Sequence, residues 1–154
     1  EYINAHPDQE VVYITDCHPE NHSSFVEFGG IWPPHCIEGT RGGAIHESFY
    51  TKVENPANRP DPNRNIFRKG CKQDEEQYSG FEAVNTNGVA LKDYANKDVV
   101  VSGIATEYCV RNTAEEFLKS GRNVELLLSG LGYVDYEGHK TTIKELREKM
   151  TIVE

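Results

Sequence analysis

A cysteine lies where a predicted apolar strand gives way to a predicted amphipathic helix. Residues 98–103 are rich in β-branched side chains, which predicts a buried parallel strand. Apolar residues recur at helical spacing after Cys109 until Gly121, a typical stop signal. Cys109 is thus expected in or near the first helical turn, where unpaired backbone N–H groups and the helix dipole favour a thiolate. Cys109 is therefore a candidate nucleophile, and the same N–H groups could hold an oxyanion. The alternative is a buried structural cysteine.

Other reactive side chains follow predicted strands in the same way. Asp16 and His18 follow residues 11–15, and Lys69 follows residues 65–68, just as Cys109 follows residues 98–103. In open α/β sheets, ligands bind beyond the carboxyl ends of the strands. The sequence therefore predicts one active site at this edge of the sheet, although each residue alone has a simpler explanation as a turn or solvated residue.

Half of a metal site is predicted around Asp16. Residues two apart on an extended segment point the same way, so the Asp16 carboxylate and the His18 imidazole share one side. His35 follows two prolines that restrict its backbone, and His22 and Glu27 lie between as candidates for a further ligand. Oxygen and nitrogen donors of this kind suit zinc, iron or manganese.

The cysteines offer a competing interpretation of this region. Cys17 and Cys36 could pair or hold a structural zinc, but Cys17 is expected to point away from His18. The four cysteines contain no CxxC pair and do not resemble a disulfide framework. We therefore expect a reduced, cytoplasmic protein.

The order of predicted elements indicates an α/β fold. Apolar strands alternate with helices, which predicts a doubly wound, mostly parallel sheet with helices on both faces. The predicted strands are residues 11–15, 65–68, 98–103 and 124–128, with 151–153 at an edge; the predicted helices are 88–95, the segment after Cys109, and about 140–149. Residues 52–64, with three prolines, are predicted to be a surface loop.

Composition limits the classes of partner. At 154 residues with 37% hydrophobic content, the chain suits a single domain, residues 1–154. A formal net charge of −9 without basic runs argues against nucleic acid or an anionic membrane as partner, and favours a small molecule. The sequence shows no membrane-spanning run and no signal peptide. A small homo-oligomer is as compatible with the sequence as a monomer.

Five motifs in order resemble one family. They are Asp-x-His-Pro-Glu-Asn-His-Ser-Ser-Phe at 16–25, Trp-Pro-Pro-His-Cys-x-x-Gly-Thr at 32–40, Arg-Lys-Gly at 68–70, Tyr-Ser-Gly-Phe-Glu at 78–82 and Gly-Ile-Ala-Thr-Glu-Tyr-Cys-Val at 103–110. Together they resemble the nicotinamidases, also called pyrazinamidases, which are cysteine hydrolases of the isochorismatase-like superfamily. Glu107 stands where this family more often has Asp.

The resemblance implies hydrolysis of nicotinamide to nicotinate and ammonia through a thioester. Cys109 matches the nucleophile, and Lys69 matches a lysine whose charge favours the thiolate and pairs with a carboxylate base. The N–H groups of Ala105 and Cys109 match the oxyanion hole. The peptide bond between Ile104 and Ala105 matches one that is cis in relatives.

The resemblance also implies one divalent transition metal, with zinc the first choice and iron or manganese the alternatives. Asp16, His18 and His35 match its ligands, and the fourth protein position varies among relatives. In this family the metal binds the pyridine nitrogen and orients the ring. The substrate-binding positions implied are Trp32, which packs on the ring, and Tyr78, Ile104 and Ala105, with Phe81 either lining the pocket or packing in the core.

One departure from the family pattern concerns the general base. Nicotinamidases begin with a strand whose first Asp is the base, and this chain opens in what resembles the helix after that strand. We therefore expect the base upstream of Glu1, and the N-terminal strand and part of the first helix to be missing from the chain. The alternatives are a noncatalytic remnant that binds metal or ligand, and a related cysteine hydrolase acting on another small amide.

Overall fold

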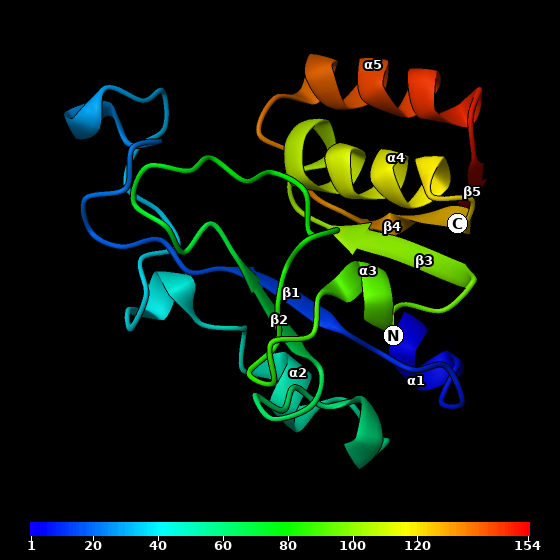
Figure 1. The fold of residues 1–154 in the computed structure, drawn as a ribbon. Helices are drawn as coiled ribbons and strands as arrows, with labels where there is room; N and C mark the ends of the chain where they lie inside the picture. The colour runs from blue at the N-terminus through cyan, green and yellow to red at the C-terminus, as the bar shows by residue number, and fades with distance from the viewer. The chain divides into compact units, whose positions relative to one another are not determined.

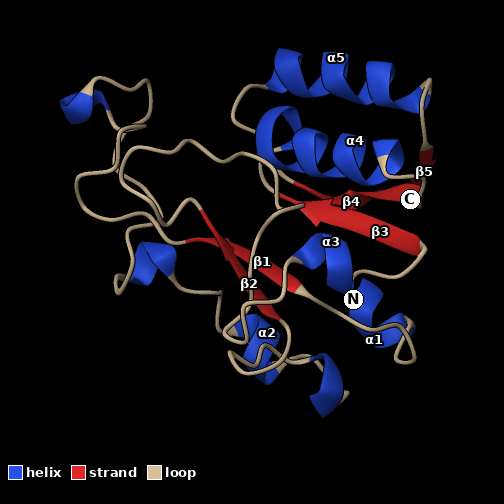
Figure 2. Ribbon diagram, in the orientation of Figure 1, coloured by secondary structure: helices blue, strands red, loops and turns tan.

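The strands pair with one another only in parallel in the computed structural model, which describes residues 1–154 (Figures 1 and 2). The chain forms two compact units. One comprises residues 1–77 and 83–90, and the other comprises residues 78–82 and 91–154. The predicted α/β class with a parallel sheet is confirmed.

The first unit contains a two-stranded sheet and short helices. Strands β1 (Tyr13–Asp16) and β2 (Ile66–Lys69) pair in a register that sets Asp16 opposite Lys69. The core of this unit includes Phe25 and Phe67, whose side chains are fully buried. The helices are α1 (Tyr2–Ala5), α2 (Ser48–Thr51) and the 3-10 turns η1 (Val26–Phe28), η2 (Arg41–Gly43) and η3 (Pro56–Asn58).

The second unit is a three-stranded sheet with helices. Its strands are β3 (Asp98–Gly103), β4 (Asn123–Leu131) and β5 (Thr151–Val153), in the order β3-β4-β5. Its helices are α3 (Leu91–Tyr94), the π-helical turn η4 (Thr106–Val110), α4 (Arg111–Lys119) and α5 (Tyr136–Arg147). Helices α3 and α4 lie on opposite sides of the sheet (Figure 1). The core includes Leu126 from β4, Phe117 from α4 and Leu146 from α5.

Element bounds depart from the sequence predictions where local hydrogen bonds extend or shorten an element. Strand β4 continues to Leu131 beyond the predicted 128. Helix α5 begins at Tyr136 instead of about 140, because the Asp135 side chain caps the helix by accepting from the Gly138 N–H at 2.6 Å. Helix α3 is a single turn, and the predicted loop 52–64 contains η3.

The prediction that residues 98–103 form a buried strand is wrong about burial. Residues along β3 alternate between exposed and half-buried, and Val100 is 37% exposed. The reason is that β3 is an edge strand of its three-stranded sheet, paired only with β4. None of the helices combines the length and apolar composition needed to cross a bilayer.

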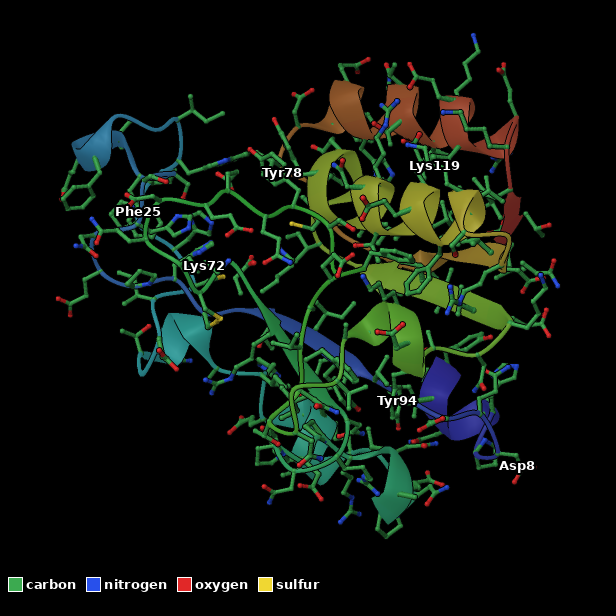
Figure 3. The ribbon with its side chains drawn as sticks, viewed as in Figure 1. Asp8, Phe25, Lys72, Tyr78, Tyr94 and Lys119 are labelled. Atoms are coloured by element: carbon green, nitrogen blue, oxygen red, sulfur yellow. A yellow bond between two sulfur atoms is a disulfide. The ribbon has the colours of Figure 1, made fainter.

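The prediction that the cysteines are unpaired is wrong for Cys17 and Cys71, which form a disulfide (Figure 3). Their Cα atoms lie 4.8 Å apart because each follows the carboxyl end of one strand in the β1–β2 pair. The alternative pairing of Cys17 with Cys36 is also wrong. Cys36 and Cys109 take part in no disulfide.

Candidate metal and nucleophile sites

Asp16, His18 and His35 lie together in the first unit, with ligand atoms that are all within 4.8 Å of one another. Asp16 is the last residue of β1. The segment around His35 runs beside His18, because the His18 N–H donates to the Cys36 carbonyl at 3.1 Å and the His18 carbonyl accepts from the Glu38 N–H at 2.9 Å. These backbone bonds bring His35 to the end of β1.

The hydrogen bonds of both imidazoles favour metal ligation through Nε2. Nδ1 of His18 lies 2.8 Å from the Gly70 carbonyl, and Nδ1 of His35 lies 2.8 Å from the Pro33 carbonyl. A carbonyl oxygen can only accept, so each Nδ1 donates its proton and the neutral ring keeps a lone pair on Nε2. Histidine ligands in proteins are oriented in this way by their second nitrogen. The donor set therefore fits a divalent transition metal.

The electrostatics of His18 also suit ligation. Burial lowers the pKa of His18 below its ordinary value of 6.5, and the nearby rings of His22 and His35 lower it further. The hydrogen bond to Gly70 and the charge of Asp16 act in the opposite direction but do not outweigh burial. Burial therefore favours the neutral form of His18, which is the form that binds a metal.

Lys69 forms an ion pair with Asp16 inside the same unit. Its Nζ lies 2.5 Å from Asp16 Oδ1 and donates to the Gln77 carbonyl at 2.9 Å, and its side chain is only 5% exposed. The second Asp16 oxygen, Oδ2, lies 4.0 Å from His18 Nε2. One carboxylate oxygen therefore pairs with the lysine while the other faces the histidine.

Gly70 is a site residue that the sequence reasoning missed. Its φ is +62°, and a Cβ at this position would lie 2.6 Å from Cε1 of His18. Its carbonyl also orients the His18 ring. The signal available in the sequence was a glycine placed directly after a strand that ends in a candidate site residue.

His22 and Glu27 do not join the three candidate ligands. The buried His22 ring lies 4.1 Å from the His18 ring, but both of its nitrogens are engaged. Nδ1 accepts from the Ser24 N–H at 3.2 Å, which leaves Nε2 to donate to the Glu75 carbonyl at 3.1 Å. Glu27 lies in η1 on the surface.

Aromatic side chains surround the three histidines. Phe25 is fully buried, and the rings of His18, His22 and His35 lie 5.4 to 5.8 Å from its own. Trp32 is half-buried, with its ring 6.1 Å from that of His35. Phe25 therefore supports the histidine rings from the core, a role that the sequence reasoning did not identify.

Cys109 lies in η4, immediately before α4 in the second unit. The turn is π-helical, with the Val110 N–H donating to the Ala105 carbonyl at 3.1 Å, where the sequence predicted an ordinary helical turn. π-helical turns occur often at functional sites. Cys109 is half-buried, and its carbonyl accepts from the Thr113 hydroxyl at 2.6 Å. The Ile104–Ala105 peptide bond is cis, as the resemblance implied.

The segment 78–82 packs against the same part of the second unit. The Tyr78 ring lies 5.5 Å from that of Tyr108, and the Gly80 N–H donates to the Thr113 hydroxyl at 2.8 Å. The Phe81 ring meets Phe117 of α4 edge-on at 5.2 Å, which favours the core-packing alternative for Phe81. Ile104 is exposed and Ala105 is buried.

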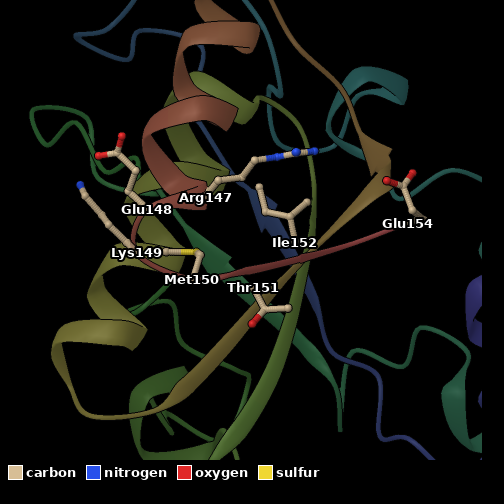
Figure 4. A pocket seen from close by; sticks show the side chains of 7 residues that line it. All are labelled: Arg147, Glu148, Lys149, Met150, Thr151, Ile152 and Glu154. Atoms are coloured by element: carbon tan, nitrogen blue, oxygen red, sulfur yellow. The ribbon is translucent and has the colours of Figure 1, made fainter.

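An open pocket in the second unit lies around β5, away from these residues. Figure 4 shows its lining, which contains none of the predicted site residues. It is formed by Arg147, Glu148, Lys149, Met150, Thr151, Ile152 and Glu154. The metal candidates and Lys69 belong to the first unit, and Cys109, Tyr78, Ile104 and Ala105 belong to the second. That all of them serve one reaction stays a prediction.

Comparison with known proteins finds relatives of this chain in one family. The isochorismatase domain matches residues 5–154. The nicotinamidase/pyrazinamidase of Mycobacterium tuberculosis is 33% identical over 144 residues, which cover 89% of this chain and 72% of that protein. The nicotinamidase of Acinetobacter baylyi is 29% identical, with 83% of this chain covered, and the chain spans only 65% of that relative's length.

A solved structure with the same fold is the pyrazinamidase of Pyrococcus horikoshii in complex with zinc. It superposes with a TM-score of 0.76 at 34% sequence identity, and the match covers 97% of this chain and 78% of that one.

Proposed function

The chain belongs to the isochorismatase domain family, and on this premise we propose that it acts as a metal-containing nicotinamidase. The observation that carries the proposal is the group of Asp16, His18 and His35, whose ligand atoms lie within 4.8 Å of one another and whose two imidazoles each hydrogen-bond to a backbone carbonyl through Nδ1. The names of the relatives supply the substrate class: nicotinamide, and pyrazinamide as a second amide.

The proposed chemistry is covalent catalysis at a carboxamide. The general base takes the Cys109 thiol proton as the sulfur attacks the amide carbon, and it returns this proton to the nitrogen as the C–N bond breaks and ammonia leaves. Water then adds to the thioester, and the C–S bond breaks to release the carboxylate product and the thiol. Backbone N–H groups of Ala105 and Cys109 are proposed to bind the oxyanion of each addition step. The general base is not assigned to any residue of this chain.

The proposed role of the first unit is substrate orientation. When bound, a divalent transition metal would supply a Lewis acid for the pyridine nitrogen. Asp16, His18 and His35 would hold that ion, and zinc is the first choice because the P. horikoshii relative was solved in complex with zinc. Iron and manganese are the alternatives. Trp32 of this unit is proposed to pack on the substrate ring, and Tyr78 of the second unit is proposed to line the substrate pocket.

The proposal is tested by ammonia release from nicotinamide. We expect Cys109→Ala to abolish turnover, His35→Ala to lose bound metal and most activity, and Cys36→Ala, which changes the other cysteine outside the disulfide, to keep activity. Turnover at the normal rate in Cys109→Ala would refute the nucleophile assignment. Metal binding without turnover in the unaltered protein would indicate a noncatalytic binding protein, and turnover of another small amide alone would indicate a related hydrolase.

A further inference from the structure

The segment that leads into Cys109 is cross-linked by hydrogen bonds to residues 130–135 in the same unit. The Ser102 hydroxyl donates to the Gly130 carbonyl at 2.8 Å, and the Gly132 N–H donates to the Gly103 carbonyl at 2.9 Å. The Thr106 N–H then donates to the Gly132 carbonyl at 2.8 Å. The chain therefore enters η4 from a fixed position beside the end of β4.

Glu107 makes the last of these cross-links. Its Oε1 accepts from the N–H of Val134 at 3.0 Å and from the N–H of Asp135 at 2.7 Å. These N–H groups directly precede α5, where the helix dipole favours a negative charge. Hydrogen bonds to a carboxylate are about twice as strong as neutral ones. Glu107 therefore ties η4 to the N-terminus of α5.

A second side-chain hydrogen bond connects η4 to α5. Nδ1 of His139 in α5 lies 3.0 Å from the Thr106 hydroxyl, which itself donates to the Gly132 carbonyl at 2.8 Å. Because that hydroxyl proton is already given to Gly132, His139 Nδ1 donates to the hydroxyl. Two successive residues of η4, Thr106 and Glu107, are thus held by the start of α5.

We propose that Glu107 is a positioning residue for the Cys109 nucleophile, an inference that rests on the proposed function. Glu107 and Cys109 belong to one five-residue π-helical turn, so fixing the Glu107 side chain fixes the direction in which the turn presents the thiol. Helix α5 does not need Glu107 as its cap, because Asp135 already accepts from the Gly138 N–H. The bonds made by Glu107 therefore act on η4.

The test compares Glu107→Ala with Asp135→Ala, which removes the side-chain cap of the same helix but keeps the Asp135 N–H that donates to Glu107. Both variants are assayed for unfolding temperature, for kcat and KM with nicotinamide, and for the rate at which iodoacetamide alkylates Cys109, followed by peptide mass. Alkylation of Cys36 in the same sample is an internal reference. Glu107→Gln keeps an oxygen that accepts both N–H bonds and is the rescue variant.

We expect Glu107→Ala to lower kcat and Cys109 alkylation by roughly tenfold or more with KM nearly unchanged, because small misplacements of a reacting group are costly. Asp135→Ala should lower the unfolding temperature but leave kcat and the Cys109 alkylation rate unchanged. Glu107→Gln should retain most of the kcat and most of the alkylation rate. Equal kcat and equal alkylation rates in Glu107→Ala and Asp135→Ala would overturn the proposal.

Two further outcomes distinguish a failure of this inference from a failure of the proposed function or of folding. If the unaltered protein does not hydrolyse nicotinamide, the proposed function fails, yet the alkylation rates still decide whether Glu107 positions the thiol. If Glu107→Ala does not fold, Glu107→Met takes its place, since it keeps a side chain of similar length but offers no oxygen to the Val134 and Asp135 N–H groups. A normal Cys109 alkylation rate in Glu107→Met would then overturn the inference.

Discussion

The carboxylate of Asp16 contacts Lys69 through one oxygen and faces His18 through the other. Oδ1 lies 2.5 Å from Lys69 Nζ, and Oδ2 lies 4.0 Å from His18 Nε2. The parallel register of β1 and β2 sets Asp16 directly opposite Lys69 at the ends of the two strands. One side chain therefore neutralises a buried lysine and contributes to the candidate metal site.

Asp16→Ala is expected to destabilise the protein even when no metal is present. The change leaves the Lys69 ammonium, which is 5% exposed, without its carboxylate. Breaking a buried ion pair by removing one partner typically costs about 3–5 kcal/mol. Urea unfolding in excess chelator should show a loss of this order in the free energy of unfolding.

His35→Ala is the matched control for Asp16→Ala. It removes another candidate ligand but leaves the Asp16–Lys69 pair intact, so its stability in chelator should change far less. The double variant Asp16→Ala with Lys69→Met should recover part of the loss, because it removes the buried ammonium together with its carboxylate. Equal stability of Asp16→Ala and His35→Ala in chelator would contradict the prediction.

Gly70→Ala is expected to weaken metal binding. The new Cβ would lie 2.6 Å from Cε1 and 2.9 Å from Nδ1 of His18, so the ring must move away from the Gly70 carbonyl that orients it. Loss of such an orienting contact typically costs about 10–100-fold in metal affinity. Competition with a chromophoric zinc chelator measures the change.

Gly88→Ala separates the contact with His18 from backbone strain. Gly88 also has a positive φ, +75°, but a Cβ there meets nothing within 4 Å. Both substitutions strain the backbone, and only Gly70→Ala displaces a candidate ligand. Zinc affinity in Gly88→Ala should therefore match that of the unaltered protein, and a similar loss in both variants would show that the ring contact is not the cause.

The parts of the fold that follow from local patterns were predictable from sequence. Alternation of β-branched strands with amphipathic helices gave the parallel α/β class, and the bounds of β3 and β5 match the predictions. The grouping of Asp16, His18 and His35 followed from the period-two geometry of an extended segment and from a family resemblance. These features depend on neighbours in the chain or on motifs visible in it.

Features that depend on long-range packing were missed. The Cys17–Cys71 disulfide requires the register of β1 against β2, which no local pattern specifies. Burial of β3 was predicted wrongly, because an apolar strand does not reveal whether it lies at an edge. The role of Gly70 depends on how closely the His18 ring approaches it, and the engagement of both His22 nitrogens depends on the distant Glu75 carbonyl.

Glu115 is expected to contribute stability only above acidic pH. The hydrogen bond from Lys149, at 2.7 Å, lowers the pKa of Glu115 below its ordinary value of 4.5, and the charges of Lys149 and Arg111 add to this against an opposing effect of burial. A lowered folded-state pKa stabilises the fold above the unfolded pKa, and the contribution disappears as pH falls through the folded value. Glu115→Gln should therefore cost roughly 0.5 kcal/mol at pH 7, since the pair is near the surface, and almost nothing near pH 2.

Denaturant unfolding at both pH values measures this difference. Glu116→Gln is the control on the same helix, because Glu116 also lies in α4 but Lys149 pairs with Glu115 and not with Glu116. A Glu115→Gln cost that stays constant across this pH range would show that packing, not the charge interaction with Lys149, is responsible.

Thr113→Val is expected to lower stability and to weaken substrate binding at the segment 78–82. The buried Thr113 hydroxyl donates to the Cys109 carbonyl at 2.6 Å and accepts from the Gly80 N–H at 2.8 Å. Valine has nearly the same shape but leaves the buried Gly80 N–H without its acceptor, at a cost of about 1–3 kcal/mol. Under the proposed role of Tyr78, which is two residues from Gly80, KM for nicotinamide should rise in Thr113→Val and stay normal in Thr113→Ser, which keeps the hydroxyl. Equal KM and equal unfolding free energies in the two variants would show that these hydrogen bonds do not hold the segment in place.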